Sequence, residues 1–397
     1  MLIKYSDIRK KLEFERKKEL DDLLAGFTHY LQSPAEYSRD NYYKPFEEQL
    51  NGSKLNKVEE TALKLPLKWD VPFPPPENPK FTFIDLFAGI GGFRIALQKQ
   101  DGKCVFSSEI DKAAKQTYEM NFGEIPFGDI RKFTGPDISD DLLDKLIPNH
   151  DLLAAGFPCQ PFSLAGVSAR NFLGKEHGFN DSNQGNLFFD ILRIVDVKRP
   201  KAVFLENVKN LRSHDKGRTF ETIKTMIKEL GYSFSSEVVN SQTRVPQRRQ
   251  RTYMVCFRDA TINYKFPSFE GEPIPLRSIL ENSVDEKYTI SDRLWQGHKN
   301  RSKRNLERGT GFSTKEADLD KPSNTIVARY YKDGKECLIP QPGKNPRKLT
   351  PRECARLQGY PESFIYHKSN SSAYKQFGNS VSVPVIERIA ESITKYL

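Results

Sequence analysis

The sequence has no long hydrophobic run. Its longest apolar stretches, such as residues 81–87, have the length of a strand, whereas a membrane-spanning helix requires about 20 apolar residues. Residues 1–20 carry charges throughout and have no apolar core of the length found in signal peptides. With 37% hydrophobic and 29% charged residues in a chain of 397, the composition is that of a soluble globular protein large enough for two domains. We therefore expect a cytoplasmic protein without a membrane partner.

Cysteine is also scarce. The five cysteines are Cys104, Cys159, Cys256, Cys337 and Cys354, and none lies in a CxxC pair or a Cys/His cluster. An odd number without such spacing argues against both a disulfide framework and a zinc site, so we expect no metal. The default interpretation of each cysteine is a small buried hydrophobic residue.

The residues around Cys159 argue against this interpretation. Cys159 lies in the stretch GFPCQPFS, where Pro158 fixes its own φ and Pro161 pushes Gln160 towards an extended conformation. The cysteine also follows a predicted strand, at the carboxyl edge of a sheet where open α/β folds bind ligands. A core cysteine needs no such bracing, whereas a thiol that must meet one carbon atom of a substrate does. We therefore interpret Cys159 as a nucleophile, with a structural cysteine as the alternative.

Positive charge is concentrated in one part of the chain. The net charge is +10, and residues 1–80 hold 14 basic and 14 acidic side chains. Residues 241–350 hold 22 basic and 13 acidic side chains, a net charge of +9. Because phosphate contacts require clustered Lys and Arg, we expect a polyanionic partner to bind this stretch.

Apolar strand patterns alternate with helical patterns in the middle of the chain. This alternation predicts an α/β fold with a doubly wound, mostly parallel sheet. The predicted strands are residues 81–87, 104–110, 151–157, 202–208 and 251–257, and the predicted helices are 91–100, 111–122, 186–200 and 219–232.

Four segments are expected. Residues 1–79 form a mainly helical extension that ends in a proline-rich linker, and residues 80–257 form the α/β domain. Residues 258–346 contain prolines, basic residues and short β-like pieces, which predict a smaller, irregular, β-rich domain. Residues 347–397 begin with a capped helix, in which Thr350 is the N-cap and is followed by a proline and, at the third position, a glutamate.

A glycine turn after the first strand indicates a ligand site. The stretch FIDLFAGIGGF brings Gly89 and Gly91 to the start of a helix, where free N–H groups are available. It departs from the dinucleotide fingerprint because Arg94 occupies the sixth position. Glu109 ends the next strand, where a carboxylate can hold ribose hydroxyls, and Asp129 is a second acid that could reach an adenine amino group. These residues favour a nucleoside ligand over an ordinary tight turn.

Two further motifs lead to the same edge of the predicted sheet. Glu206 in FLENV is either a solvated strand end or, beside a nucleophilic cysteine, an acid that protonates or hydrogen-bonds a substrate. The stretch QRRQR is either a basic surface turn or an extended segment. In an extended segment, alternation would place Gln247, Arg249 and Arg251 on one side, towards the pocket.

The motifs resemble those of a known family, the bacterial DNA cytosine-C5 methyltransferases. From about residue 81 to the C-terminus, the family's motifs occur in the family's order: DLFAGIGGF, GFPCQPFS, FLENV, PQRRQR, LTPRECARLQGYP and QFGNSVSVPV. The stretch ARYYKDGKE and the long N-terminal extension look most similar to the enzymes that read CC-GG-type sites. The resemblance implies a type II restriction–modification methylase that acts on double-stranded DNA.

The resemblance also implies a cofactor, S-adenosylmethionine, which would be converted to S-adenosylhomocysteine. Carried over by position, the residues that would line the cofactor pocket are Phe87, Gly89, Gly91, Glu109, Ile110, Asp129, Ile130, Pro158 and Leu187, and Asn379 and Ser380 would close it. The last two are included because the end of the chain returns beside the glycine turn in this family.

The implied catalytic residues are carried over in the same way. Cys159 would attack C6 of a cytosine flipped out of the duplex, Glu206 would hold N3 and Arg251 would contact O2. Gln247 and Arg249 would support this pocket, and residues 163–179 would form a closing loop. The residues expected to contact DNA are Gln160, Ser163, Thr325 and Arg329, and segment 258–346 matches the target-recognition region.

The resemblance further implies protection of host DNA from a cognate restriction endonuclease encoded alongside, with no stable complex between the two, and we expect a monomer on DNA. Two alternatives stay open at this point. An RNA cytosine-5 methyltransferase would use the same thiol chemistry. A DNA-binding regulator would carry an idle methylase core.

Overall fold

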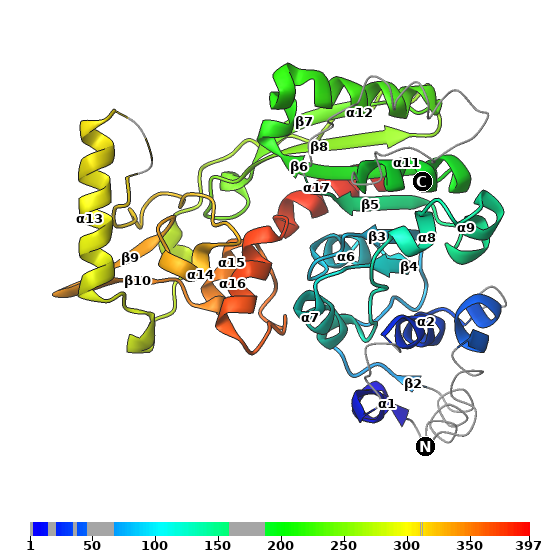
Figure 1. Ribbon diagram of the computed structural model, residues 1–397, viewed down its shortest axis with the longest axis horizontal. Coiled ribbons are helices and arrows are strands. Elements are labelled where there is room, and N and C mark those ends of the chain that lie inside the picture. The colour runs from blue at the N-terminus through cyan, green and yellow to red at the C-terminus, as the bar shows by residue number, and fades with distance from the viewer. Residues whose placement is uncertain are drawn as a thin grey trace. The chain divides into compact units, whose positions relative to one another are not determined.

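The computed structural model describes residues 3–14, 21–34, 38–45, 67–158, 187–309, 311 and 313–397 (Figure 1). The chain forms two compact units, each built from separate parts of the sequence. The first unit comprises Met1–Val238, Arg251–Pro267 and Ile389–Leu397, and the second comprises Val239–Gln250 and Ser268–Arg388.

A six-stranded sheet organises the first unit. Its strand order is β4-β3-β5-β6-β8-β7, with β3 at Phe81–Leu86, β4 at Gly102–Ser108, β5 at Leu152–Gly156, β6 at Ala202–Val208, β7 at Ser235–Asn240 and β8 at Gln250–Phe257. The β3–β4, β3–β5 and β5–β6 pairs are parallel, and β6 pairs with β8 in the antiparallel direction. The prediction of a doubly wound, mostly parallel sheet is confirmed, and each of the five predicted strands is present.

The central strands are apolar along most of their length because both of their faces are covered. In β5 and β6 almost every residue is buried, as expected where helices cover a parallel sheet on both sides. Among the described residues between β3 and β7, the helices of this unit are α6 (Gly92–Gln98), α7 (Lys112–Phe122), α8 (Arg131–Thr134), α9 (Asp140–Leu146), α11 (Leu187–Lys198) and α12 (Arg218–Glu229). The four helices predicted from the sequence correspond to α6, α7, α11 and α12.

The start of the chain belongs to the first unit. The strand β1 (Ile3–Lys4) pairs in parallel with β2 (Leu67–Lys68), and the helices are α1 (Tyr5–Phe14), α2 (Asp21–Gln32) and a π-helical turn at Arg39–Tyr43. The described part of this extension is therefore largely helical, as its sequence predicts.

The second unit contains a small antiparallel sheet and several helices. The strands are β9 (Leu338–Gln341) and β10 (Lys344–Lys348), and the helices are α13 (Asp292–Glu307), α14 (Tyr330–Asp333), α15 (Pro351–Leu357), α16 (Asn370–Asn379) and the beginning of α17 (Val383–Ile393). The short 3-10 turns of this unit lie at Ser241–Thr243, Leu276–Ile279 and Glu286–Tyr288, and those of the first unit lie at Lys209–Arg212, His214–Gly217 and Thr394–Tyr396. The predicted capping box of α15 is confirmed, since the Thr350 hydroxyl accepts from Glu353 N and the Glu353 carboxylate accepts from Thr350 N.

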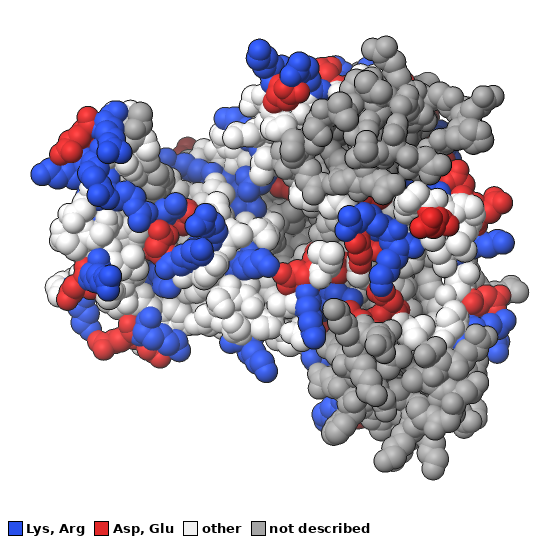
Figure 2. All heavy atoms as spheres, in the orientation of Figure 1, with Lys and Arg blue, Asp and Glu red and all other residues white. Residues whose placement is uncertain are grey.

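Helix α13 departs from the expectation of short β-like pieces in residues 258–346. Of its 16 residues only His298 is buried, so the helix has no apolar stripe for sequence periodicity to reveal. Its start does carry a signal, because the Ser291 hydroxyl accepts from Leu294 N and Asp292 lies in the first turn. Figure 2 shows a group of Lys and Arg side chains over this helix. The exposed basic residues of α13 are Arg293, Lys299, Arg301, Lys303 and Arg304.

A buried ion pair lies between α6 and the segment that follows α7. The Arg94 side chain is fully buried, and its Nη1 donates to Glu124 Oε1 at 2.8 Å. Its Nε donates to Gln98 Oε1 and its Nη2 to Gln32 Oε1, both at 2.6 Å. The guanidinium also lies over the ring of Phe122, 4.8 Å from its centroid. One arginine therefore joins α6, α2 and the end of α7.

Replacing this arginine tests how much the network stabilises the fold. We expect Arg94→Met to lower the free energy of unfolding by roughly 3–5 kcal/mol, because it leaves the Glu124 carboxylate buried without its charge partner. Urea denaturation followed by circular dichroism measures the change. Arg218→Met is the matched control, since Arg218 forms an exposed pair with Asp215, three residues earlier in the chain. An Arg94→Met protein as stable as this control would contradict the prediction.

Candidate active site

The turn after β3 has left-handed backbone at three positions. Phe87 has φ 54°, Gly89 φ 56° and Gly91 φ 83°. At Gly91, a Cβ atom would lie 2.2 Å from a ring carbon of Phe122, so only glycine fits there. At Gly89, a Cβ atom would meet no atom within 4 Å, so open space adjoins the turn. Phe87 is a non-glycine residue held at positive φ, two residues before the open space at Gly89, and such strained backbone is typical of a ligand site.

Glu109 joins this turn to the end of β4. Its Oε2 accepts from Gly89 N at 2.8 Å and its Oε1 accepts from Asp111 N at 2.6 Å. Burial raises the pKa of the Glu109 carboxyl, and the two N–H donors act in the opposite direction. The neighbouring Ile110 leaves 71% of its surface exposed, which is unusual for a large apolar side chain. The structure thus brings together a glycine turn, a carboxylate and an exposed apolar side chain.

The segment that carries Asp129 lies along β4. Glu109 N donates to Phe127 O at 2.8 Å, and Phe127 N donates to Ser107 O at 2.9 Å. The Asp129 carboxylate accepts hydrogen bonds from the Arg131 side chain, which hold the pKa of Asp129 below its ordinary value. Asp129 is therefore ionised over most of the pH range. Ile130 is buried in the core of this unit rather than exposed like Ile110.

The ends of β5 and β6 form a second part of the site. Gly156 lies opposite Glu206 in the parallel register. The Asn207 side chain donates to Phe157 O at 2.9 Å and so fixes the chain just before Pro158, which is exposed. Sequence reasoning missed this asparagine, although a polar residue inside a strand of apolar neighbours was the available signal.

The predicted nucleophile Cys159 lies outside the described residues. The same holds for Gln160 and Ser163, and for the predicted closing loop 163–179. The described chain leads up to Pro158 at the sheet edge that carries Glu206.

Glu206 and Arg251 face each other from adjacent strands. Arg251 Nε lies 3.1 Å from Glu206 Oε1, and the two side chains are 15% and 11% exposed. The antiparallel register of β6 and β8 pairs Glu206 with Tyr253 and Val208 with Arg251, which places both charged groups at the same end of the two strands. This arrangement offers a carboxylate and a guanidinium to one ligand.

Gln247 and Arg249 contact residues of the second unit. Gln247 accepts from Ile326 N at 2.9 Å and donates to Leu357 O at 3.2 Å. Arg249 donates to Ile326 O at 3.2 Å, to Gly378 O at 3.3 Å and to Ser380 O. Both side chains are buried among backbone carbonyls, so they hold three segments of this unit together.

The remaining predicted residues lie in two different units. Leu187 opens α11 and packs half-buried against the core of the first unit. In the second unit, Asn379 is exposed at the end of α16, and Ser380 Oγ lies 2.7 Å from the Tyr360 hydroxyl. Thr325 donates to Arg248 O at 2.8 Å, and Arg329 is exposed at the N-cap of α14.

The four described cysteines are buried, as predicted for each. Burial raises the pKa of the thiol in Cys104, Cys256, Cys337 and Cys354, in Cys337 to about 12. A buried thiol with a raised pKa is a poor source of thiolate, so none of these four suits a nucleophilic role. Among the described residues no cluster of His, Cys, Asp or Glu could hold a metal ion. No helix in the described ranges is long and apolar enough to cross a membrane.

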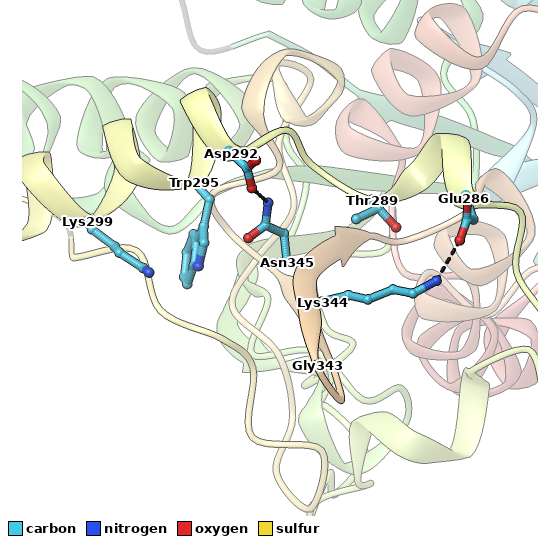
Figure 3. A pocket seen from close by; sticks show the side chains of 8 residues that line it. All are labelled: Glu286, Thr289, Asp292, Trp295, Lys299, Gly343, Lys344 and Asn345. Carbon is cyan, nitrogen blue, oxygen red and sulfur yellow. Dashed lines mark hydrogen bonds and ion pairs between the residues drawn. The ribbon is translucent and has the colours of Figure 1, made fainter.

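An open pocket of about 630 Å³ lies within the second unit, between α13 and the β9–β10 turn (Figure 3). Lys344 pairs with Glu286 at 2.5 Å, and the Asn345 side chain donates to Asp292 at 2.6 Å. The residues that line the pocket also include Trp295 and Lys299, and none of them is a predicted cofactor or catalytic residue.

Comparisons with known proteins identify the same family as the sequence motifs. A family model described as C-5 cytosine-specific DNA methylase matches residues 81–395. The chain is 48% identical over 330 residues to the type II methyltransferase M.DsaV of Dactylococcopsis salina, a match that covers 81% of this chain and 88% of that protein. It is 50% identical over 318 residues to the type II methyltransferase M.NlaX of Neisseria lactamica, which covers 79% of this chain and 96% of that protein. The crystal structure of S. pombe Dnmt2 methyltransferase shares the fold, with a TM-score of 0.62 at 19% identity over 79% of this chain and 98% of that one.

The contacts of Arg249 predict a structural effect that its exposed neighbour should not share. We expect Arg249→Met to lower the free energy of unfolding by roughly 3 kcal/mol, because three carbonyls lose a charged donor. Hydrogen exchange should rise in peptides that cover residues 376–381. Arg248→Met is the control, since the Arg248 side chain is exposed. Equal stability and equal exchange in the two variants would contradict this assignment.

Proposed function

Since the chain belongs to the C-5 cytosine-specific DNA methylase family and is a type II DNA (cytosine-5)-methyltransferase, we propose that it methylates C5 of a flipped-out cytosine through a covalent bond between Cys159 and C6. The methyl donor is S-adenosylmethionine, and the substrate is a specific sequence in double-stranded DNA.

The observation that carries the proposal is the Glu206–Arg251 pair at the edge where the Cys159 loop begins. A flipped cytosine presents the ring nitrogen N3 and, on the adjacent carbon C2, the oxygen O2. Glu206 protonates or hydrogen-bonds N3, and the Arg251 guanidinium donates to O2. The Asn207–Phe157 hydrogen bond positions the residue just before Pro158 and the predicted nucleophile Cys159. The four described cysteines are buried with raised pKa values, which also favours Cys159 as the nucleophile.

The described residues fit the methyl donor. Open space beside Gly89 leaves room for a ligand against the backbone, and Glu109 presents a carboxylate for ribose hydroxyls. The exposed Ile110 offers an apolar surface to a purine, and Asp129 offers an acceptor to its amino group. We assign Phe87, Gly91, Ile130, Pro158, Leu187, Asn379 and Ser380 to the same pocket on their motif positions. When bound, S-adenosylmethionine supplies an electrophilic methyl group.

The protein's part of the reaction is to make C5 nucleophilic. The Cys159 thiolate adds to C6 while Glu206 holds N3, so that electron density moves to C5. After C5 is methylated, its proton leaves to a base, the C5–C6 double bond re-forms and Cys159 departs as thiolate. We assign Gln247 and Arg249 to the support of this pocket on their motif positions.

Recognition of DNA is assigned to segment 258–346, which together with residues 241–257 carries most of the net positive charge. Thr325 and Arg329, together with Gln160 and Ser163, are assigned to DNA contacts, and loop 163–179 closes over the extruded base. As in a type II restriction–modification system, methylation protects host DNA from a cognate endonuclease, and the enzyme acts as a monomer.

Covalent trapping tests this mechanism. In DNA synthesised with 5-fluorodeoxycytidine, fluorine occupies the position of the C5 proton and cannot leave as a cation. The enzyme should methylate once and stay attached, giving a complex that survives denaturation and requires S-adenosylmethionine. Gel electrophoresis with labelled DNA detects it, and randomly substituted plasmid DNA presents every sequence.

Single substitutions identify the nucleophile. Cys159→Ala should abolish both trapping and methyl transfer yet still bind DNA, because phosphate and base contacts come from other residues. Cys104→Ala, Cys256→Ala, Cys337→Ala and Cys354→Ala are the controls, and each should still be trapped. An adduct that persists in Cys159→Ala would mean that the wrong nucleophile is assigned. An active wild type without any adduct would contradict covalent catalysis.

A further inference from the structure

Helix α2 lies outside the part of the chain that the family model matches, yet it contacts the segment that carries Asp129. The match begins at residue 81, whereas α2 comprises Asp21–Gln32. Figure 1 shows α2, in dark blue, next to β4. Both belong to the first unit. This helix therefore contributes contacts to the methylase core from outside the residues that the family model matches.

The contacts of α2 run along residues 122–132. At one end of the helix, Gln32 Nε2 donates to Phe122 O at 2.6 Å. One turn earlier, the Thr28 hydroxyl accepts from Ile125 N at 3.0 Å. With Gly128 N, three backbone groups of this segment therefore hydrogen-bond to side chains of α2 rather than to the methylase core. The helix thus sets the path of the backbone here.

The contact nearest to the proposed cofactor pocket is made by Asp22. Its Oδ1 accepts from Gly128 N at 3.0 Å, and its other carboxylate oxygen pairs with Lys132. A Cβ atom on Gly128 would lie 3.2 Å from Asp22 Oδ1, so the backbone approaches the carboxylate closely. Gly128 immediately precedes Asp129, so Asp22 holds the Phe127–Gly128 peptide, one residue before the one that carries the Asp129 side chain.

His29 holds the same segment from the side. Its ring stacks on that of Phe127 with the centroids 4.6 Å apart, and its Nε2 accepts from Ser107 N at 3.1 Å. Burial lowers the pKa of His29, so the ring is neutral, and its Nδ1–H donates to Ala25 O at 2.8 Å. The helix is thus fixed to β4, two residues before Glu109, as well as to the segment that precedes Asp129.

We infer that α2 positions the adenine side of the S-adenosylmethionine pocket, with Asp22 as the positioning residue for Asp129. The inference rests on the proposed function, since it takes Asp129 as a cofactor contact. Asp22 acts through the Gly128 backbone and does not itself touch the cofactor. Without this hydrogen bond, the Phe127–Gly128 peptide loses its fixed orientation just before Asp129, and binding of the cofactor must then order this segment.

The test compares three variants of the full-length protein by calorimetric titration with S-adenosylmethionine. Asp22→Ala removes the acceptor and should weaken cofactor affinity about tenfold. Asp22→Asn keeps an oxygen acceptor for Gly128 N but loses the charge that pairs with Lys132, and it should restore most of the affinity. Asp40→Ala is the matched control, because Asp40 pairs with Lys44 inside the same extension, and it should bind like the wild type.

A second readout separates positioning from general stability. Hydrogen exchange in Asp22→Ala should rise in peptides that cover residues 122–132, while β3, β5 and β6 keep their protection and DNA affinity stays unchanged. Wild-type affinity and wild-type exchange in Asp22→Ala would overturn the inference. So would an equal loss of protection across the whole first unit, which would make Asp22 a residue of general stability. A wild-type protein that fails to bind S-adenosylmethionine would instead overturn the proposed function, and with it this inference.

Discussion

One partly buried carboxylate organises the part of the first unit around the glycine turn. Glu109 accepts from the N–H groups of Gly89 and Asp111, and so ties the glycine turn after β3 to the start of α7. Its own N–H donates to Phe127 O, which fixes the segment leading to Asp129. Because burial disfavours the charged form of Glu109, these donors are needed to keep a carboxylate there. The positions of the turn, of α7 and of Asp129 therefore all depend on this residue.

The residues predicted to be catalytic belong to different units. Glu206 and Arg251 meet across β6 and β8 in the first unit, whereas Gln247 and Arg249, which come just before β8, bind carbonyls of the second unit. One short basic motif thus supplies an ion pair to the sheet of the first unit and hydrogen bonds that join segments of the second. This explains why basic residues so close in sequence differ in burial and in partners.

Much of the fold could be predicted from the sequence, because buried parallel strands are continuous apolar runs. Strand β7 and helix α13 could not, since an edge strand with one buried residue and a helix with solvent around it carry little apolar pattern. Alternation through QRRQR agrees with the burial of this stretch, since Gln247 and Arg249 are buried while Arg248 and Gln250 are exposed. It could not give the partners of Gln247 and Arg249, because these lie about 80 to 130 residues further along the chain. The contacts of α2 were also hidden, since Asp22 and Gly128 are about a hundred residues apart and neither lies in a motif.

The central claim is that the Glu109 carboxylate, in its charged form, completes the cofactor pocket. Ribose hydroxyls donate to a carboxylate and favour its ionised form, so binding should lower the raised pKa of Glu109 and release a proton. The affinity for S-adenosylmethionine, measured by calorimetry between about pH 5 and pH 7, should therefore rise with pH in the wild type. In Glu109→Gln, which has no group to ionise, affinity should be weaker and independent of pH over this range. A wild type and a Glu109→Gln protein with the same affinity at every pH would contradict the account.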